Sequence, residues 1–178
     1  MPMNELVQKA LEFGFSHAAS LDSSTLVLRP EVRDMCAADK CKAYGRNWMC
    51  PPACGSLEEN SERMKGYSFG LIVQTTGDME DDFDYEVMKE AGDEQKRRFH
   101  EYTKILKQQY PNLLALTSGS CELCKTCSYP DAPCRRPEDA MPSMEAFGLV
   151  VSDVCRDNDL PYYYGPRTIT YTGCFLLS

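Results

Sequence analysis

The sequence lacks any long apolar run. No stretch approaches the roughly 18 apolar residues that a membrane-spanning helix requires, so we do not expect a membrane protein. The first ten residues also lack a basic segment followed by an apolar one, which is the pattern of a secretory signal. Both absences favour a cytoplasmic protein.

Positive charge is scarce as well. The chain has 19 lysines and arginines against 27 aspartates and glutamates, which gives a net charge of −8. Nucleic acids and anionic membranes select basic surfaces, and we therefore expect neither as a partner. The acidic balance permits a basic protein partner, and the cysteine pattern described below favours a redox protein. The composition assigns no oligomeric state.

Recognisable catalytic motifs are missing too. The chain contains no Gly-rich dinucleotide fingerprint, no P-loop and no catalytic-triad pattern. Its only histidines are His17, beside an expected strand, and His100, in an expected long helix. We expect neither histidine to bind metal. The sequence leaves open whether the protein is an enzyme.

Cysteine, in contrast, is abundant, with ten residues in a chain of 178. Disulfides are rare in the reducing cytoplasm, where clustered cysteines more often bind metals or act as redox centres. Eight of the ten fall into two sets of four, and each set is sufficient for one four-ligand site. The first set is Cys36, Cys41, Cys50 and Cys54, and the second set is Cys121, Cys124, Cys127 and Cys134.

The second set has a spacing typical of iron–sulfur sites. A bacterial ferredoxin run reads C-x2-C-x2-C-x3-C-P. The first three cysteines match this run, and Cys134 lies three residues beyond the expected fourth position. A zinc knuckle uses only two cysteines at this interval, so the third one favours a [4Fe–4S] cluster. One or two closed zinc sites are the alternative.

The first set lies in residues 36–54, where Pro51 and Pro52 disfavour both helix and sheet. Its spacing, C-x4-C-x8-C-x3-C, fits no standard zinc finger. A radical-SAM triad is excluded, because position 57 is leucine. We expect a second [4Fe–4S] site here, and exchange of ligands between the two sets stays open. If one set supplied only three thiolates, one iron would be open to a substrate.

Other residues have supporting roles in this interpretation. Nearby cations help to set the potential of a cluster, although the same residues also fit ordinary surface charge. Tyr44 and Trp48 could shield a cluster from water. Cys155 and Cys174 stand outside both sets, and we expect them to pack in the core, as buried free cysteines do. The cations in question are Lys40, Lys42, Arg46, Lys125, Arg135 and Arg136.

Apolar periodicity predicts one α+β or α/β domain over residues 1–178. It has a small central sheet, flanking helices and two cysteine-rich metal-binding loops at 36–54 and 121–134. The expected helices cover 3–13, 31–35, 56–65, 85–109, 143–147 and 150–158, and the expected strands cover 17–21, 67–76, 113–117, 162–164 and 168–177.

Charged and capping residues mark the ends of two expected helices. Ser56 and Glu59 have the spacing of a capping box. The acid-rich run 78–86 is expected to cap the long helix, whose dipole favours negative charge at that end. The ion pairs expected along this helix are Asp93 with Arg97 and Glu94 with Arg98.

Three motifs together resemble a family of cysteine-rich, predicted metal-binding proteins of anaerobic bacteria and archaea. They are YGRNWMCPPAC at 44–54, GSCELCKTCSYPDAPCR at 119–135 and PSMEA at 142–146. The resemblance covers about residues 5–177 and implies cysteine-bound metal, of iron–sulfur type, in a cytoplasmic redox setting. It implies that the eight loop cysteines are ligands and that Cys155 and Cys174 are not. The family supplies no reaction.

These observations lead to three hypotheses. The first is an iron–sulfur protein with two [4Fe–4S] sites that transfers electrons in anaerobic metabolism. The second is an enzyme that uses an open iron of one cluster on a small substrate. The third is a zinc-stabilised interaction module without a redox role.

Overall fold

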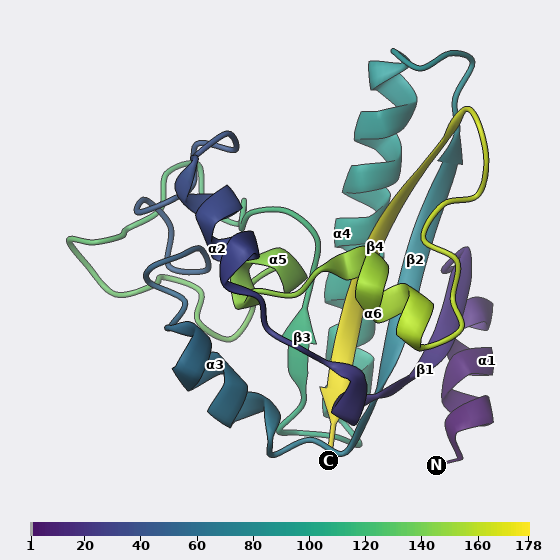
Figure 1. Cartoon of the computed structure of the whole chain (residues 1–178), viewed down its shortest axis with the longest axis horizontal. Coiled ribbons are helices and arrows are strands. Elements are labelled where there is room, and N and C mark those ends of the chain that lie inside the picture. Colours follow the sequence, from purple (N-terminus) through teal and green to yellow (C-terminus); the bar gives the residue numbers. More distant parts are fainter. Residues whose placement is uncertain (1) are drawn as a thin grey trace.

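The computed structural model describes residues 2–178 and has a four-stranded sheet at its centre (Figure 1). The strands lie in the order β1-β2-β4-β3. All three strand pairs are antiparallel, so the fold is α+β rather than the alternating α/β form. The strands are β1 (His17–Asp22), β2 (Phe69–Asp78), β3 (Leu114–Leu116) and β4 (Thr168–Leu177).

Helices pack on both faces of this sheet (Figure 1). Among residues 2–178, none of them is long and apolar enough to cross a membrane. The helices are α1 (Met3–Phe13), the short 3-10 helix η1 (Ser23–Thr25), α2 (Pro30–Ala37), α3 (Leu57–Met64), α4 (Tyr85–Lys107), α5 (Met144–Phe147) and α6 (Val151–Asp157).

The central strand β2 divides the core into two layers. Neighbouring side chains on a strand point to opposite faces of the sheet. Ile72 therefore packs with α5 and α6, whereas Leu71 and Val73 pack with α1 and α4 on the other face. Burial on both faces explains why these three positions form a continuous apolar run rather than an alternating one.

Helix α4 lies close against β4 because Gly173 has no side chain. A Cβ atom at this position would come within 2.6 Å of Cε2 of Phe99. The Phe99 ring stacks on Phe175, with ring centroids 4.2 Å apart and an angle of 11°. Burial of one such side chain contributes about 1.5–3 kcal/mol. This contact fixes which face of α4 is turned toward the cysteine segments.

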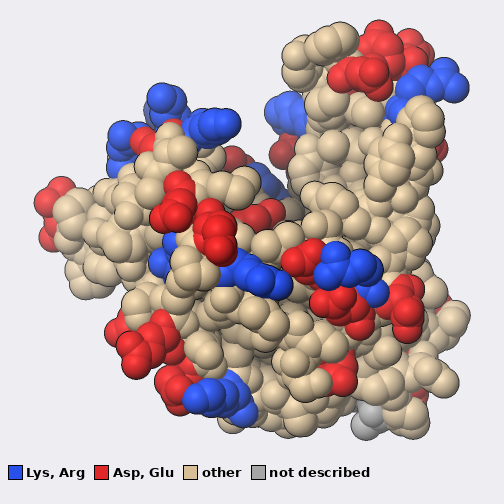
Figure 2. Space-filling model, viewed as in Figure 1, with Lys and Arg blue, Asp and Glu red and all other residues tan. Residues whose placement is uncertain are grey.

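The cysteine-bearing segments gather with α2 and α3 on one side of the sheet, next to β3 (Figure 1). The amino-terminal half of α4 and the tips of β2 and β4 extend away from them. Figure 2 shows a deep notch between these two parts of the surface, with charged side chains along its walls. The sheet therefore acts as a platform that carries the cysteine segments along one edge.

Most of the expected elements are confirmed. Residues 3–13 and 168–177 match α1 and β4 at both ends. Ser56 and Glu59 form the expected capping box of α3. From the acidic run, Asp84 caps α4, because its Oδ1 accepts a hydrogen bond from the backbone N–H of Val87 at 3.1 Å.

The strand expected at residues 162–164 is wrong, because this segment has no strand structure. Tyr164 instead stacks on His17, with ring centroids 3.9 Å apart. The Tyr164 hydroxyl donates to Oε1 of Gln74, a buried residue of β2, at 2.6 Å. The aromatic residues that favoured a strand thus pack through their side chains against the sheet without adding a strand to it.

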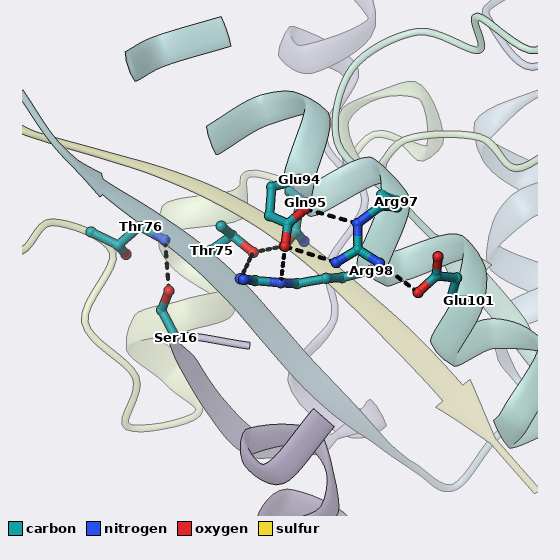
Figure 3. Close-up of polar contacts among 8 residues, drawn as sticks. All are labelled: Ser16, Thr75, Thr76, Glu94, Gln95, Arg97, Arg98 and Glu101. Atoms are coloured by element: carbon teal, nitrogen blue, oxygen red, sulfur yellow. Dashed lines mark hydrogen bonds and ion pairs between the residues drawn. The ribbon is translucent and has the colours of Figure 1, made fainter. Parts of the chain in front are cut away.

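One of the two expected ion pairs on α4 is also wrong. Asp93 pairs with Lys89, while Arg97 is held by Glu94 and Glu101 (Figure 3). Arg97 thus already has two carboxylate partners on its own helix. The other pair is confirmed, because Arg98 Nε lies 2.8 Å from Glu94 Oε1.

Candidate metal centre

The first cysteine segment is shaped by a series of tight turns. Cys36 lies in the last turn of α2, so only the following part of this segment is a loop. Asp39 and Lys42 adopt positive φ angles of 52° and 58°. The carboxylate of Asp39 accepts a hydrogen bond from the Tyr44 backbone N–H at 3.1 Å and pairs with Arg46 at 3.1 Å. These contacts fold the segment back on itself, which brings its cysteines closer together.

Two neighbouring side chains connect the first segment to the second. Asn47, which is buried, donates from Nδ2 to the backbone carbonyl oxygen of Cys121 at 2.9 Å. The indole N–H of Trp48 donates to the carbonyl oxygen of Ala132 at 3.0 Å, and its ring meets Tyr129 edge to face. Trp48 thus packs on the second segment.

Three cysteines of the first set line one cavity of about 200 Å³. They are Cys36, Cys41 and Cys50. Cys54 does not line it. The Cys54 thiol donates to the carbonyl oxygen of Ala146 at 3.4 Å. Cys54 itself borders a different cavity. Three thiols of the first set thus share a cavity, whereas the fourth lies outside its lining and contacts Ala146, which borders the same cavity.

All four cysteines of the second set line a single cavity. The space between them is much smaller, about 20 Å³. A single water needs roughly 10–15 Å³ by the same kind of measure. The open space among these thiols is thus little larger than one water, so the segment has to rearrange before its sulfurs can surround a metal ion or a cluster. Trp48, Arg135 and Arg136 also belong to the lining.

Burial keeps several of these thiols protonated in the metal-free chain. It raises the pKa of Cys36, Cys54 and Cys121, because a thiolate is poorly solvated inside protein. The pKa of Cys50 rises to about 12, first through burial and then through the negative charges of nearby thiolates. Metal binding must displace these protons, since only the thiolate is a ligand.

The cysteines that contribute to the raised pKa of Cys50 come from both sets. Three of them, Cys41, Cys54 and Cys36, belong to the first set, so Cys54 stays within its electrostatic reach. The fourth is Cys121 of the second set. The two sets adjoin near Cys50 and Cys121, because the Asn47 carbonyl oxygen accepts from the Cys50 N–H at 3.1 Å and Asn47 Nδ2 donates to the Cys121 carbonyl oxygen at 2.9 Å.

The sulfurs surround their cavities without meeting in coordination geometry. Within residues 2–178 no three His, Cys, Asp or Glu side chains form a group that could hold a metal ion. All ten cysteines are free thiols. The donor set nevertheless fits a soft metal, because thiolates select zinc, copper(I) and iron–sulfur clusters. Cavity size then separates the two sites, since the larger space belongs to the first set.

Glu145 is a site residue that the cysteine spacing could not reveal. Its side chain is exposed to water, yet it lines the cavity of Cys36, Cys41 and Cys50 and is surrounded by protein. Desolvation by the surrounding protein raises the pKa of its carboxyl. The only signal in the sequence was its place in the 142–146 motif.

The remaining expected residues occupy varied positions. Arg135 lies at the second set, where it also donates to the carbonyl oxygen of Thr126 at 2.8 Å. Tyr44 lines the cavity of the first set. Cys155 and Cys174 are buried in the core cluster between the sheet and α6, as expected. His17 stacks on Tyr164, away from both sets, and His100 borders another cavity that includes Cys121.

The fold and donors define a class, an α+β protein whose cysteine-lined cavities suit soft metals. The chain belongs to the DUF2284 family of predicted metal-binding proteins, whose family model matches residues 19–177. The family description leaves the metal unspecified. Searches of the curated proteins and of the solved structures found no match.

Proposed function

We propose that the protein is an iron–sulfur electron carrier of the cytoplasm with two adjacent cluster sites. The observation that carries this proposal is the adjacency of the two cysteine segments at Asn47, whose Nδ2 donates to the Cys121 carbonyl oxygen at 2.9 Å and whose own backbone carbonyl oxygen accepts from the Cys50 N–H at 3.1 Å. A closed zinc site needs no neighbour, whereas electron transfer between two centres requires them to be close. The natural partner of such a carrier is a redox protein.

In this proposal each cysteine set holds one cluster, and the cluster supplies reversible one-electron chemistry. The eight thiolates anchor the two clusters. Trp48 and Tyr129 cover the second site and exclude water. Arg33, whose Nη2 lies 3.9 Å from Cys54 Sγ, provides positive charge at the first site. Such cations stabilise an anionic cluster and so raise its reduction potential.

The two cavities would have to change in different ways to hold a cluster. The first has room within its 200 Å³, but Cys54 must turn from Ala146 toward its set. The second, at 20 Å³, must open before it accepts a cluster. Opening is feasible because residues 121–134 contain no helix or strand whose hydrogen bonds would have to break.

A second candidate function rests on the orientation of Cys54. If this thiol stays on Ala146, three cysteines would hold the first cluster, and Glu145 lines the same cavity. The fourth iron would then be open to a small substrate, and the protein would be an enzyme. Cys54→Ser decides between the two functions. It removes the first cluster from an electron carrier with four thiolate ligands, and leaves the cluster in place if Cys54 is not a ligand.

The test of the proposal is the metal content of anaerobically purified protein. Close to eight irons with matching labile sulfide per chain supports two clusters. Zinc without labile sulfide overturns the proposal and leaves a zinc-stabilised module, which would be colourless and would unfold when the metal is chelated. Four irons with one zinc would mean that the small second cavity holds a single ion, which also contradicts the two-cluster proposal.

A further inference from the structure

A separate cavity of about 230 Å³ lies between α4 and the segment that leads from β3 to Cys121. Lys96, Arg97 and His100 line it from the helix side. The opposite wall is formed by Thr117, Ser118 and Ser120, each of which has a hydroxyl group. Cations and hydroxyl donors thus face one space beside the second cysteine set, which is a combination that recognises oxyanions.

Thr117, which lines this cavity, has a hydroxyl group without a hydrogen-bond partner among residues 2–178. Thr117 is only 6% exposed. Its backbone groups are satisfied, because the N–H donates to Pro142 and the carbonyl accepts from Met144. A buried hydroxyl without a partner costs free energy. The Thr117 Oγ1 is covered in this structure, so a ligand oxygen in the cavity removes that cost once the wall shifts enough to let the two meet.

Lys96 is the cation best placed to exchange partners. It now pairs with Glu122, whose side chain is 64% exposed. By comparison, Arg97 is fixed between Glu94 and Glu101 on its own helix (Figure 3). The Lys96–Glu122 pair bridges the two walls of the cavity, since one residue comes from each. A stronger anion inside the cavity would compete with Glu122 for the ammonium group.

Gly119 supports this arrangement through its backbone. It adopts a φ of +69°, which favours glycine, and a Cβ atom there would lie 3.9 Å from Cε of Lys96. The turn therefore brings the hydroxyl segment alongside the lysine. The segment 117–120 thereby faces the cavity while it delivers Cys121 to the metal site.

We propose that this cavity binds a small oxyanion, of the size of inorganic phosphate or a short carboxylate. Lys96 and the Thr117 hydroxyl are its main contacts, and Glu122 is a competitor that leaves when the anion enters. The site uses side chains of this chain alone. Cys121 also lines the cavity but is not one of the proposed contacts, so failure of this site would leave the proposed function unaffected.

Isothermal titration calorimetry on anaerobically purified protein tests the proposal. Sodium phosphate and sodium acetate are the probes, and sodium chloride at the same ionic strength is the reference. We expect saturable one-to-one binding of at least one probe. Lys96→Met and Thr117→Val should each weaken it, the lysine change by roughly tenfold or more, as for the loss of a hydrogen bond to a charged group. Glu122→Gln should strengthen it.

Lys89→Met is the matched control. Lys89 is another lysine of α4 that pairs with an acid, in this case Asp93, but it does not line the cavity. It should leave binding unchanged. No saturable binding of either probe beyond chloride would overturn the proposal. Binding that Lys96→Met and Glu122→Gln leave unaltered would overturn it as well. If Lys96→Met fails to fold, the gain of affinity in Glu122→Gln still decides the question.

Discussion

Asn47 donates from Nδ2 to the backbone carbonyl oxygen of Cys121 at 2.9 Å, and thereby joins two cysteine segments that are 74 residues apart in the sequence. The same side chain accepts from the Met49 backbone N–H at 2.9 Å. One buried amide thus holds both the turn before Cys50 and the start of the second set. The positions of the two sets relative to each other depend on it.

Asn47→Ala should therefore lower the metal content of the purified protein and destabilise the chain by about 1–3 kcal/mol, the cost of leaving buried partners unsatisfied. Metal analysis and urea unfolding measure both effects. Asn112→Ala is the control, because Asn112 is exposed and its backbone, not its side chain, accepts from Tyr67. Equal metal content in the two variants would contradict the role assigned to Asn47.

The close approach of α4 to the sheet predicts the effect of Gly173→Ala. The new methyl group would meet Phe99 Cε2 at 2.6 Å and the Leu116 carbonyl oxygen at 3.0 Å. Overpacking of this kind costs about 1–3 kcal/mol, which urea unfolding would measure. Gly66→Ala serves as the control, because its nearest neighbour would lie 3.6 Å away. A destabilisation no larger than that of the control would show that α4 can shift freely.

The core thiol of Cys155 predicts a pH dependence of stability. Burial raises its pKa from 9.0 to about 11 in the folded chain, whereas the thiol ionises at its ordinary value when unfolded. A raised pKa stabilises the fold fully below the ordinary value, and this contribution is lost as the pH rises from about 9 toward 11. The free energy of unfolding should thus fall over that range.

Cys155→Ala isolates this effect from the other thiols. The variant starts from a lower stability, because it removes a buried sulfur, but its free energy of unfolding should fall less steeply as the pH rises from about 9 toward 11. Chemical denaturation with a chelator and reductant present measures both slopes. Identical slopes would mean that Cys155 ionises in the folded state as readily as in the unfolded state.

The parts of the fold that local patterns determine were predictable from the sequence. Ser56 and Glu59 predict the start of α3, and the apolar run at Leu71–Val73 predicts a strand that is buried on both faces. The strand predicted at 162–164 was wrong because aromatic residues favour strands, and no local pattern shows that Tyr164 stacks on His17 instead. Strand order could not be read from sequence either, since it depends on contacts between distant residues.

For the candidate site, spacing indicated which cysteines belong together but could not show where each thiol points. The four cysteines of the second set do line one cavity, as their short intervals suggest. Cys54 departs from its set because its thiol finds the carbonyl oxygen of Ala146, 92 residues later in the chain. Glu145 belongs to α5, the same distant helix as Ala146, and lines the cavity of the first set. The spacing of the cysteines cannot reveal such a residue.

The most direct test of two adjacent clusters is the electron paramagnetic resonance spectrum of the fully reduced, anaerobically purified protein. Two neighbouring paramagnetic clusters should give a broadened or split signal, which becomes that of an isolated cluster in Cys50→Ser and in Cys121→Ser. A wild-type spectrum that is the simple sum of the two variant spectra, or the absence of any iron–sulfur signal, would contradict the account.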